Sequence, residues 1–159
     1  MKEVSIVGRS NGYEHSFKAE GEIWVVSSAF KLLHPDKVNL IFQLHKPDTW
    51  EKWLPVECKR VVTAFPGKLV KYRNYPVEYM LKKYGPVFGS SISWMIALAI
   101  EEKFEKINIF GCDMASKTEY IDQRDTFFYM CGRAEALGIE INIPKDSRTF
   151  YKDRIYGVM

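Results

Sequence analysis

The sequence lacks any apolar run that approaches the roughly 18 residues of a membrane-spanning helix. It also lacks a glycine-lysine loop of the Walker type, which argues against an ordinary ATPase. Its three cysteines, Cys58, Cys112 and Cys131, are odd in number and widely spaced, unlike those of a disulfide framework or a zinc site. We therefore expect a cytoplasmic protein with no export signal, no membrane anchor and no bound metal.

The chain also lacks a large excess of positive or negative charge. The 23 Lys and Arg residues against 20 Asp and Glu residues give a formal charge of +3, well short of what a dedicated duplex-DNA binder carries. Nucleic acid is therefore unsupported as a partner. The small positive excess suits a small anionic ligand of the nucleotide type.

Apolar and aromatic side chains, by contrast, are abundant. At 159 residues, 47% of them hydrophobic, the chain has material for one domain, 1–159, with a real core. Its 4 Trp, 9 Tyr and 10 Phe residues are hard to bury in one small domain. We therefore expect part of this aromatic surface to form the interface of a homo-oligomer.

Buried-type strands alternate with helices along the chain. Apolar runs and turn signals predict strands at 4–7, 23–26, 40–44, 60–64, 106–110 and 139–143. Helical spacing predicts helices at 29–33, 77–83, from 90 onward and at 123–137, and a helical turn after Asp48 that carries Trp50. The segment 66–86 otherwise reads as a solvated connector or as a flap over the site. This order predicts an α/β protein with a Rossmann-like open, mostly parallel sheet and helices on both faces.

Ligands of open α/β sheets collect at the carboxyl ends of the strands. Applied to this chain, that rule gathers small and polar residues along one edge. The candidates are Gly8, Ser10, Asn11, Ser27, Ser28, Gln43, His45, Gly89, Ser90, Ser91 and Asp113. We therefore expect the binding site at this edge.

The run Gly89-Ser90-Ser91 opens the helix that precedes the strand 106–110. Glycine lets a ligand approach the backbone closely, and the two hydroxyls stand beside the unpaired N–H groups of a helix start, an arrangement that suits phosphate or carboxylate. The alternative is that one serine only caps the helix.

Two further groups are candidates for chemistry. Asp113, at the end of a strand, is placed to hold a ribose hydroxyl, a metal ion or a proton in transit, or else forms a turn or caps a helix. Tyr120 and Arg124 are four residues apart and share a face if Tyr120 lies in the first turn of its helix, where they would bind a phosphate. The alternative is an ordinary solvated helix start. His45 follows a predicted strand and is the candidate general base, whereas His15 and His34 fall in loops without obvious partners.

Three stretches carry a family resemblance. They are Gly89 to Ile100, Ile107 to Met114, and Glu119-Tyr120 with Gln123-Arg124. In them the chain resembles a family of small phage-encoded Rossmann-like proteins. It is similar, more distantly, to bacterial sialyltransferases that use a CMP-activated donor and to pterin pyrophosphokinase-like proteins.

The resemblance covers mainly residues 89–147, with 4–8 and 23–28 fitting the opening strands. It implies a nucleotide pocket formed by Gly8 and its loop, the Ser27-Ser28 turn, 89–91 and Asp113, with Tyr120 binding the donor phosphate. For a phage-encoded protein the setting is the host cytoplasm.

These observations predict a nucleotide-binding transferase that acts on a nucleotide-activated donor, similar to glycosyltransferases. In it Asp113 and His45 would be the catalytic residues, and no cofactor other than that donor is expected. One alternative is a module that senses or sequesters a small anionic ligand without changing it. Another is an oligomeric structural protein that keeps a vestigial Rossmann core.

Overall fold

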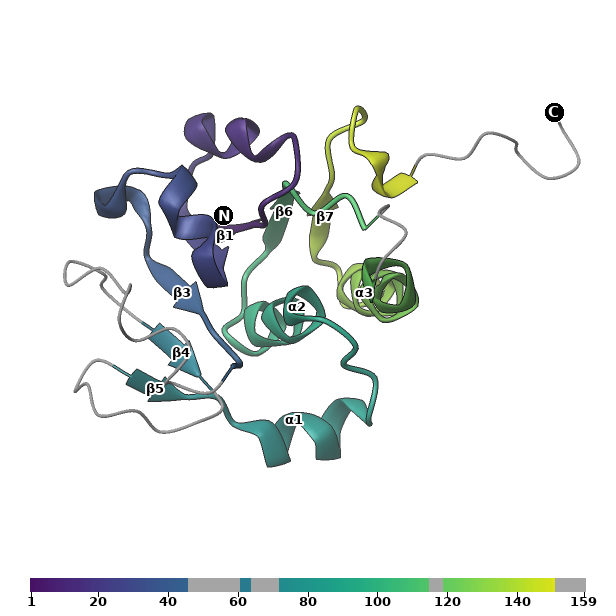
Figure 1. Cartoon of the computed structure of the whole chain (residues 1–159). Coiled ribbons are helices and arrows are strands. Elements are labelled where there is room, and N and C mark those ends of the chain that lie inside the picture. Colours follow the sequence, from purple (N-terminus) through teal and green to yellow (C-terminus); the bar gives the residue numbers. More distant parts are fainter. Residues whose placement is uncertain (46–60, 64–71, 115–118, 151–159) are drawn as a thin grey trace, which may run out of the picture.

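A seven-stranded sheet forms the centre of the computed structural model, which describes residues 1–45, 61–63, 72–114 and 119–150 (Figure 1). Its strands are β1 (Glu3–Val7), β2 (Glu22–Val26), β3 (Leu40–Phe42), β4 (Val61–Thr63), β5 (Tyr72–Asn74), β6 (Lys106–Phe110) and β7 (Glu140–Asn142). Their order is β5-β4-β3-β2-β1-β6-β7, and every neighbouring pair is parallel. The predicted open parallel sheet is confirmed.

The strand β1 lies at the point where the connections change direction. From β1 the chain runs outward through β2, β3, β4 and β5, and it then returns to place β6 and β7 on the other side of β1. The connections therefore diverge between β1 and β6. In open α/β sheets such a switch point leaves a crevice at the carboxyl ends of the strands.

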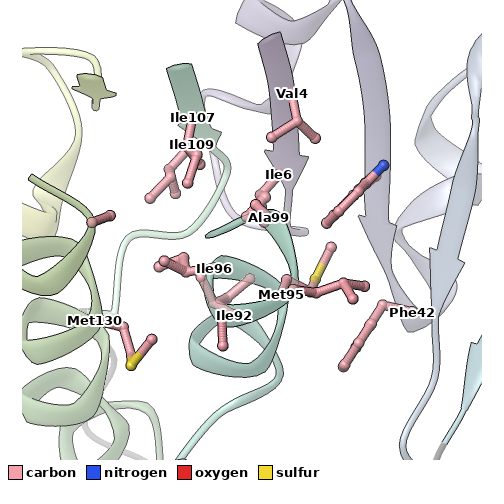
Figure 2. Close-up of a cluster of buried hydrophobic side chains, with 14 of the residues drawn as sticks. Val4, Ile6, Phe42, Ile92, Met95, Ile96, Ala99, Ile107, Ile109 and Met130 are labelled. Atoms are coloured by element: carbon pink, nitrogen blue, oxygen red, sulfur yellow. The ribbon is translucent and has the colours of Figure 1, made fainter. Parts of the chain in front are cut away.

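One face of the sheet is covered by the helices α1 (Val77–Tyr84), α2 (Ser91–Glu101) and α3 (Glu119–Ala136), as Figure 1 shows. Figure 2 shows part of the core beneath them, to which α2 contributes Ile96, α3 contributes Met130, and the sheet contributes Ile6 and Ile107. All four side chains are fully buried. The apolar stripe of α2 runs almost around the helix because α2 packs against both the sheet and α3.

The opposite face carries two short 3₁₀ helices, η1 (Tyr13–Lys18) and η2 (Ser27–Leu32). A second apolar cluster lies there and includes Val25, Phe30, Ile41 and Phe110. Strands covered on both sides need apolar residues at consecutive positions, which explains runs such as Trp24-Val25 and Ile41-Phe42. The prediction of helices on both faces holds, with the segment predicted as a helix at 29–33 forming part of η2.

Three predictions about individual elements need correction. The predicted connector contains the strand β5. Its three residues carry no apolar pattern that would reveal a strand, since its support comes from pairing with β4. β3 ends at Phe42 rather than at Leu44, because its ladder pairing with β2 and β4 ends at Phe42. α3 begins at Glu119, four residues before the predicted start.

Other predicted boundaries hold. β6 has the predicted bounds, and α3 ends one residue before the predicted terminus. Gly138 follows with φ 82°, and its N–H donates to the carbonyl of Glu135, as expected of a terminating glycine. The predicted turn after Asp48 lies outside the described residues. Within the described ranges, no helix is long and apolar enough to cross a membrane.

Candidate functional site

A cavity of about 470 Å³ opens at the carboxyl ends of the central strands. It is lined by residues from the loop after β1, the ends of β2 and β3, the start of α2, the loop after β6, and α3. These residues are Gly8, Arg9, Ser10, Val26, Leu44, His45, Phe88, Gly89, Ser90, Ser91, Ile92, Trp94, Gly111, Cys112, Asp113, Met114 and Gln123. We call this the main cavity. Seven of the predicted site residues meet in it, namely Gly8, Ser10, His45, Gly89, Ser90, Ser91 and Asp113.

The floor of the main cavity is a close contact between the loops that follow β1 and β6. The N–H of Gly8 donates to the carbonyl of Phe110 at 2.9 Å, and the N–H of Ser10 donates to the carbonyl of Gly111 at 2.8 Å. A Cβ atom at Gly8 would lie 2.3 Å from the oxygen of Gly111, and Gly111 has φ 62°. Both positions therefore require glycine, one for space and the other for its backbone conformation.

The start of α2 forms one wall. Ser90 is buried, its Oγ accepts the N–H of Ser93 at 3.2 Å, and the N–H of Ser90 donates to the Oγ of Ser93 at 3.2 Å, which completes a capping box. These bonds match the capping alternative for Ser90. Ser91, the first residue of the helix, also lines the cavity. In an α-helix the N–H groups of the first turn have no intrahelical acceptor, which gives this wall a positive partial charge.

Asp113 forms the opposite wall. Its Oδ1 accepts a hydrogen bond from the Oγ of Ser10 at 3.2 Å, which links the loops after β1 and β6. The loop is held from behind, because the Thr149 hydroxyl donates to the carbonyl of Cys112 at 2.7 Å. Met114 has φ 45°, a conformation that side chains rarely adopt, so the loop is strained where it meets the cavity.

Cys112 is not a nucleophile in this setting. Its side chain is buried, and burial raises the pKa of the thiol to about 12. The thiol donates to the carbonyl of Phe110 at 3.3 Å. At neutral pH the group is therefore a neutral thiol that packs against Gly8.

Sequence reasoning missed an aromatic wall on the β3 side of the main cavity. The rings of Phe88 and Trp94 stack with centroids 3.7 Å apart and planes 10° apart. The hydroxyl of buried Tyr75 donates to the carbonyl of Trp94 at 2.9 Å, which fixes the wall from behind. The sequence could have indicated this wall, because one aromatic residue directly precedes Gly89 and a second lies one turn into α2.

Three predicted site residues lie elsewhere. Asn11 lines a smaller neighbouring cavity. Gln43 is buried, and its Oε1 accepts the N–H of His45 at 3.1 Å. Arg124 shares α3 with Tyr120, but its guanidinium donates to the carbonyl of Thr149 and lies 5.5 Å from the ring centre of Phe128. The side chains of Ser27, Ser28 and Tyr120 lie outside the described part of the structure.

The prediction that His15 and His34 have no partners is wrong. The Nε2 of His15 lies 3.2 Å from Oδ2 of Asp146, and the Nδ1 of His34 lies 3.1 Å from Oδ2 of Asp36. The sequence hides the first pair because 131 positions separate its members. Across the described ranges, no three His, Cys, Asp or Glu side chains gather closely enough to hold a metal ion.

Comparison with known proteins identifies the fold. No protein-family model and no curated protein matches the sequence. Among solved structures, the chain is similar to the sialyltransferase CstII from Campylobacter jejuni in complex with the substrate analogue cytidine-5'-monophosphate, with a TM-score of 0.62 and 12% identity over 92% of this chain and 81% of the other. The complex of the same enzyme with CMP-3FNeuAc gives a TM-score of 0.62 and 12% identity over 90% and 80%. At this identity the likeness shows a shared Rossmann-like fold.

Proposed function

We propose that this protein is a transferase that binds a nucleotide-activated donor in the main cavity, in the manner of a glycosyltransferase. One observation carries the proposal. The cavity at the switch point brings the start of α2, the Gly8 loop and Asp113 together around about 470 Å³. This volume lies in the range of small-molecule sites, and the lining combines apolar walls with a few convergent polar groups.

The start of α2 is the proposed site of the donor phosphate. Ser91 offers a hydroxyl beside the first N–H groups of an 11-residue helix, and Gly89 also lines the cavity. When the donor bond breaks, negative charge grows on the leaving phosphate. Fixed N–H groups that point at this charge stabilise the transition state more than the ground state. Tyr120 is the further phosphate ligand that the family resemblance proposes.

Asp113 is the proposed partner of the ribose or of the acceptor. Its Oδ1 is held by Ser10, so the carboxylate is oriented before a ligand arrives. His45 lines the β3 side of the same cavity, where a histidine can accept a proton near neutral pH. The structural neighbours were solved with cytidine-5'-monophosphate and CMP-3FNeuAc, which makes CMP the first nucleotide to test.

Thermal unfolding with CMP, UMP, ADP and their sugar conjugates tests binding. A ligand that binds only the folded protein adds about 2.7 kcal/mol at one hundred times its Kd, a shift of several degrees in Tm. Turnover is then followed by ³¹P NMR with the sugar conjugate that binds. Asp113→Asn should abolish turnover and leave the Tm of the free protein within a degree or two.

The outcomes separate the candidate functions. No shift with any nucleotide would contradict the proposal and favour a structural role for the chain. Binding without turnover would favour a module that senses or sequesters the ligand. Unchanged turnover in Asp113→Asn would remove that residue from the mechanism.

A further inference from the structure

A second, smaller cavity of about 80 Å³ adjoins the main cavity. The two share Gly111 and Asp113 as lining residues, so the Asp113 side chain stands between them. We call it the side cavity. Since roughly 10–15 Å³ of such space is enough for one water molecule, the side cavity has room for several waters or for the hydroxyl end of a larger molecule.

His15 lines the side cavity and is paired with a carboxylate. Its Nε2 lies 3.2 Å from Oδ2 of Asp146, which also lines the cavity. With the Nε2–H donating to Asp146, the other ring nitrogen, Nδ1, keeps its lone pair and can accept a proton. The ring centre lies 6.1 Å from that of Phe110, at the end of β6. A base that a second group orients is the arrangement that general-base catalysis uses.

Charged groups surround this imidazole. Asp113 and Asp146 line the side cavity with negative charge, and Arg148 lines it with positive charge. On the imidazole's own 3₁₀ helix, the carboxylate of Glu14 accepts the N–H of Gly12 at 3.1 Å. Among these groups, Asp146 is the one that contacts the imidazole, with its Oδ2 3.2 Å from Nε2.

We propose that His15 is the general base of the transfer and that Asp146 is its positioning residue. The inference rests on the proposed function. The acceptor hydroxyl gives its proton to Nδ1 of His15, and its oxygen forms a bond to the donor carbon. The bond from that carbon to the phosphate oxygen breaks, and its electron pair leaves with the nucleotide in the main cavity.

The position of the side cavity favours His15 over His45. Asp113 follows β6 and forms a wall of the side cavity. His45 follows β3, and three strand spacings separate β3 from β6 in the sheet. At about 4.8 Å per spacing, these strands lie roughly 14 Å apart. His45 therefore follows a strand far from the one that precedes Asp113, whereas His15 and Asp113 line the same side cavity.

The test uses CMP-NeuAc as donor and water as acceptor, with CMP release followed by ³¹P NMR. We expect His15→Gln to slow release by about 100-fold, the lower range of general-base effects. The matched control is His34→Gln, which removes a similar exposed histidine-aspartate pair outside both cavities. It should leave the rate unchanged. His45→Gln should slow release less than His15→Gln does.

Asp146→Asn adds a measurement that distinguishes a positioning role of Asp146 from a purely structural one. A neutral amide orients the imidazole less firmly than a carboxylate does, so kcat for release should fall while the KM for CMP-NeuAc stays unchanged. In parallel, NMR of the imidazole Cε1–H signals should show that CMP shifts the signal of His15 and not that of His34.

Each outcome decides the matter. If His15→Gln binds CMP and releases it from CMP-NeuAc as fast as the wild type does, the inference is overturned and the proposed function still stands. If the wild-type protein binds CMP but does not release it from CMP-NeuAc, and CMP does not shift the NMR signal of His15, the inference is overturned and a binding module is favoured. Absence of CMP binding would overturn the inference and the CMP form of the proposed function together.

Discussion

The two ends of α2 use their polar groups in opposite ways. At the end of the helix, Glu101 receives three hydrogen bonds from α1: from Nζ of Lys83 at 2.6 Å, from the Tyr84 hydroxyl at 2.5 Å and from the Tyr79 hydroxyl at 2.6 Å. At the start, Ser90 is occupied by its own capping box, while Ser91 lines the main cavity. One end is tied to a neighbouring helix, and the other borders a cavity.

This difference distinguishes a structural contact between two helices from a candidate binding site. An acidic group near a helix C-terminus is unfavourable with the helix dipole, so Glu101 needs its three donors. At the start of the helix, the dipole leaves a positive partial charge beside the cavity, where a ligand can complement it. Polar groups that the protein leaves for another molecule, rather than those that it pairs internally, thus mark the candidate site.

We expect the largest loss of stability from a substitution in the middle of α2, because packing there holds the whole helix in place. Ile96 is fully buried between the sheet and α3 (Figure 2). Ile96→Ala should lower the free energy of unfolding by about 3 kcal/mol, because it removes buried contacts and leaves a cavity. Urea unfolding measures this loss. Leu137→Ala, at a side chain that is 63% exposed, is the control and should change it by less than about 0.5 kcal/mol. Equal effects would contradict the packing described above.

The next effect concerns the floor of the main cavity. Gly8→Ala places a Cβ atom 2.3 Å from the oxygen of Gly111 and 2.7 Å from the sulfur of Cys112, so the loops must move apart. We expect a loss of about 2 kcal/mol and weaker nucleotide binding. Gly132→Ala, where nothing lies within 4 Å, should instead stabilise α3 by roughly 0.5 kcal/mol. A Gly8→Ala protein as stable as the wild type would show that the loops are not in close contact.

A smaller effect distinguishes the two serines at the start of α2. Ser90→Ala removes the capping hydroxyl and should cost about 1 kcal/mol in urea unfolding. Ser91→Ala should leave the stability within about 0.5 kcal/mol and weaken CMP binding about tenfold in calorimetry. If Ser90→Ala weakened CMP binding and Ser91→Ala did not, the roles assigned to the two hydroxyls would be reversed.

The smallest effect is the pH dependence of the hydrogen bonds between Glu101, at the end of α2, and α1. Partial burial raises the pKa of Glu101, but hydrogen bonds from Lys83, Tyr79 and Tyr84 outweigh it and leave the pKa below its usual value near 4.5. A lowered pKa in the folded state stabilises the protein above the unfolded value and loses this effect as the pH falls through the folded value. Glu101→Gln should therefore cost about 1 kcal/mol or less at pH 7, and the difference from wild type should shrink below pH 4.5. Urea unfolding at several pH values measures it, and a difference that did not change with pH would contradict the assigned bonds.

The elements that the sequence predicts best are those with strong local patterns. β6 and α2 have apolar runs and small residues at their boundaries, and the structure places both as predicted. β5 was missed because its three residues carry no apolar pattern, and it exists only through pairing with β4. The candidate site follows the same rule. Gly8 and Asp113 were found because strand ends converge in a parallel sheet, and Gly89 because it opens a helix. The Phe88–Trp94 stack was missed because Trp94 also fits an ordinary apolar helix face.

The sequence by itself determined the parallel α/β order and the edge of the sheet at which the polar residues gather, because strand and helix periodicity are local properties of the chain. Only the tertiary structure decided which of these residues meet. It assigned Ser90 to the helix cap, turned Arg124 toward the carbonyl of Thr149, and joined His15 to Asp146. Contacts between distant segments depend on how the strands order and the loops pack, and no spacing along the chain encodes a pair 131 positions apart.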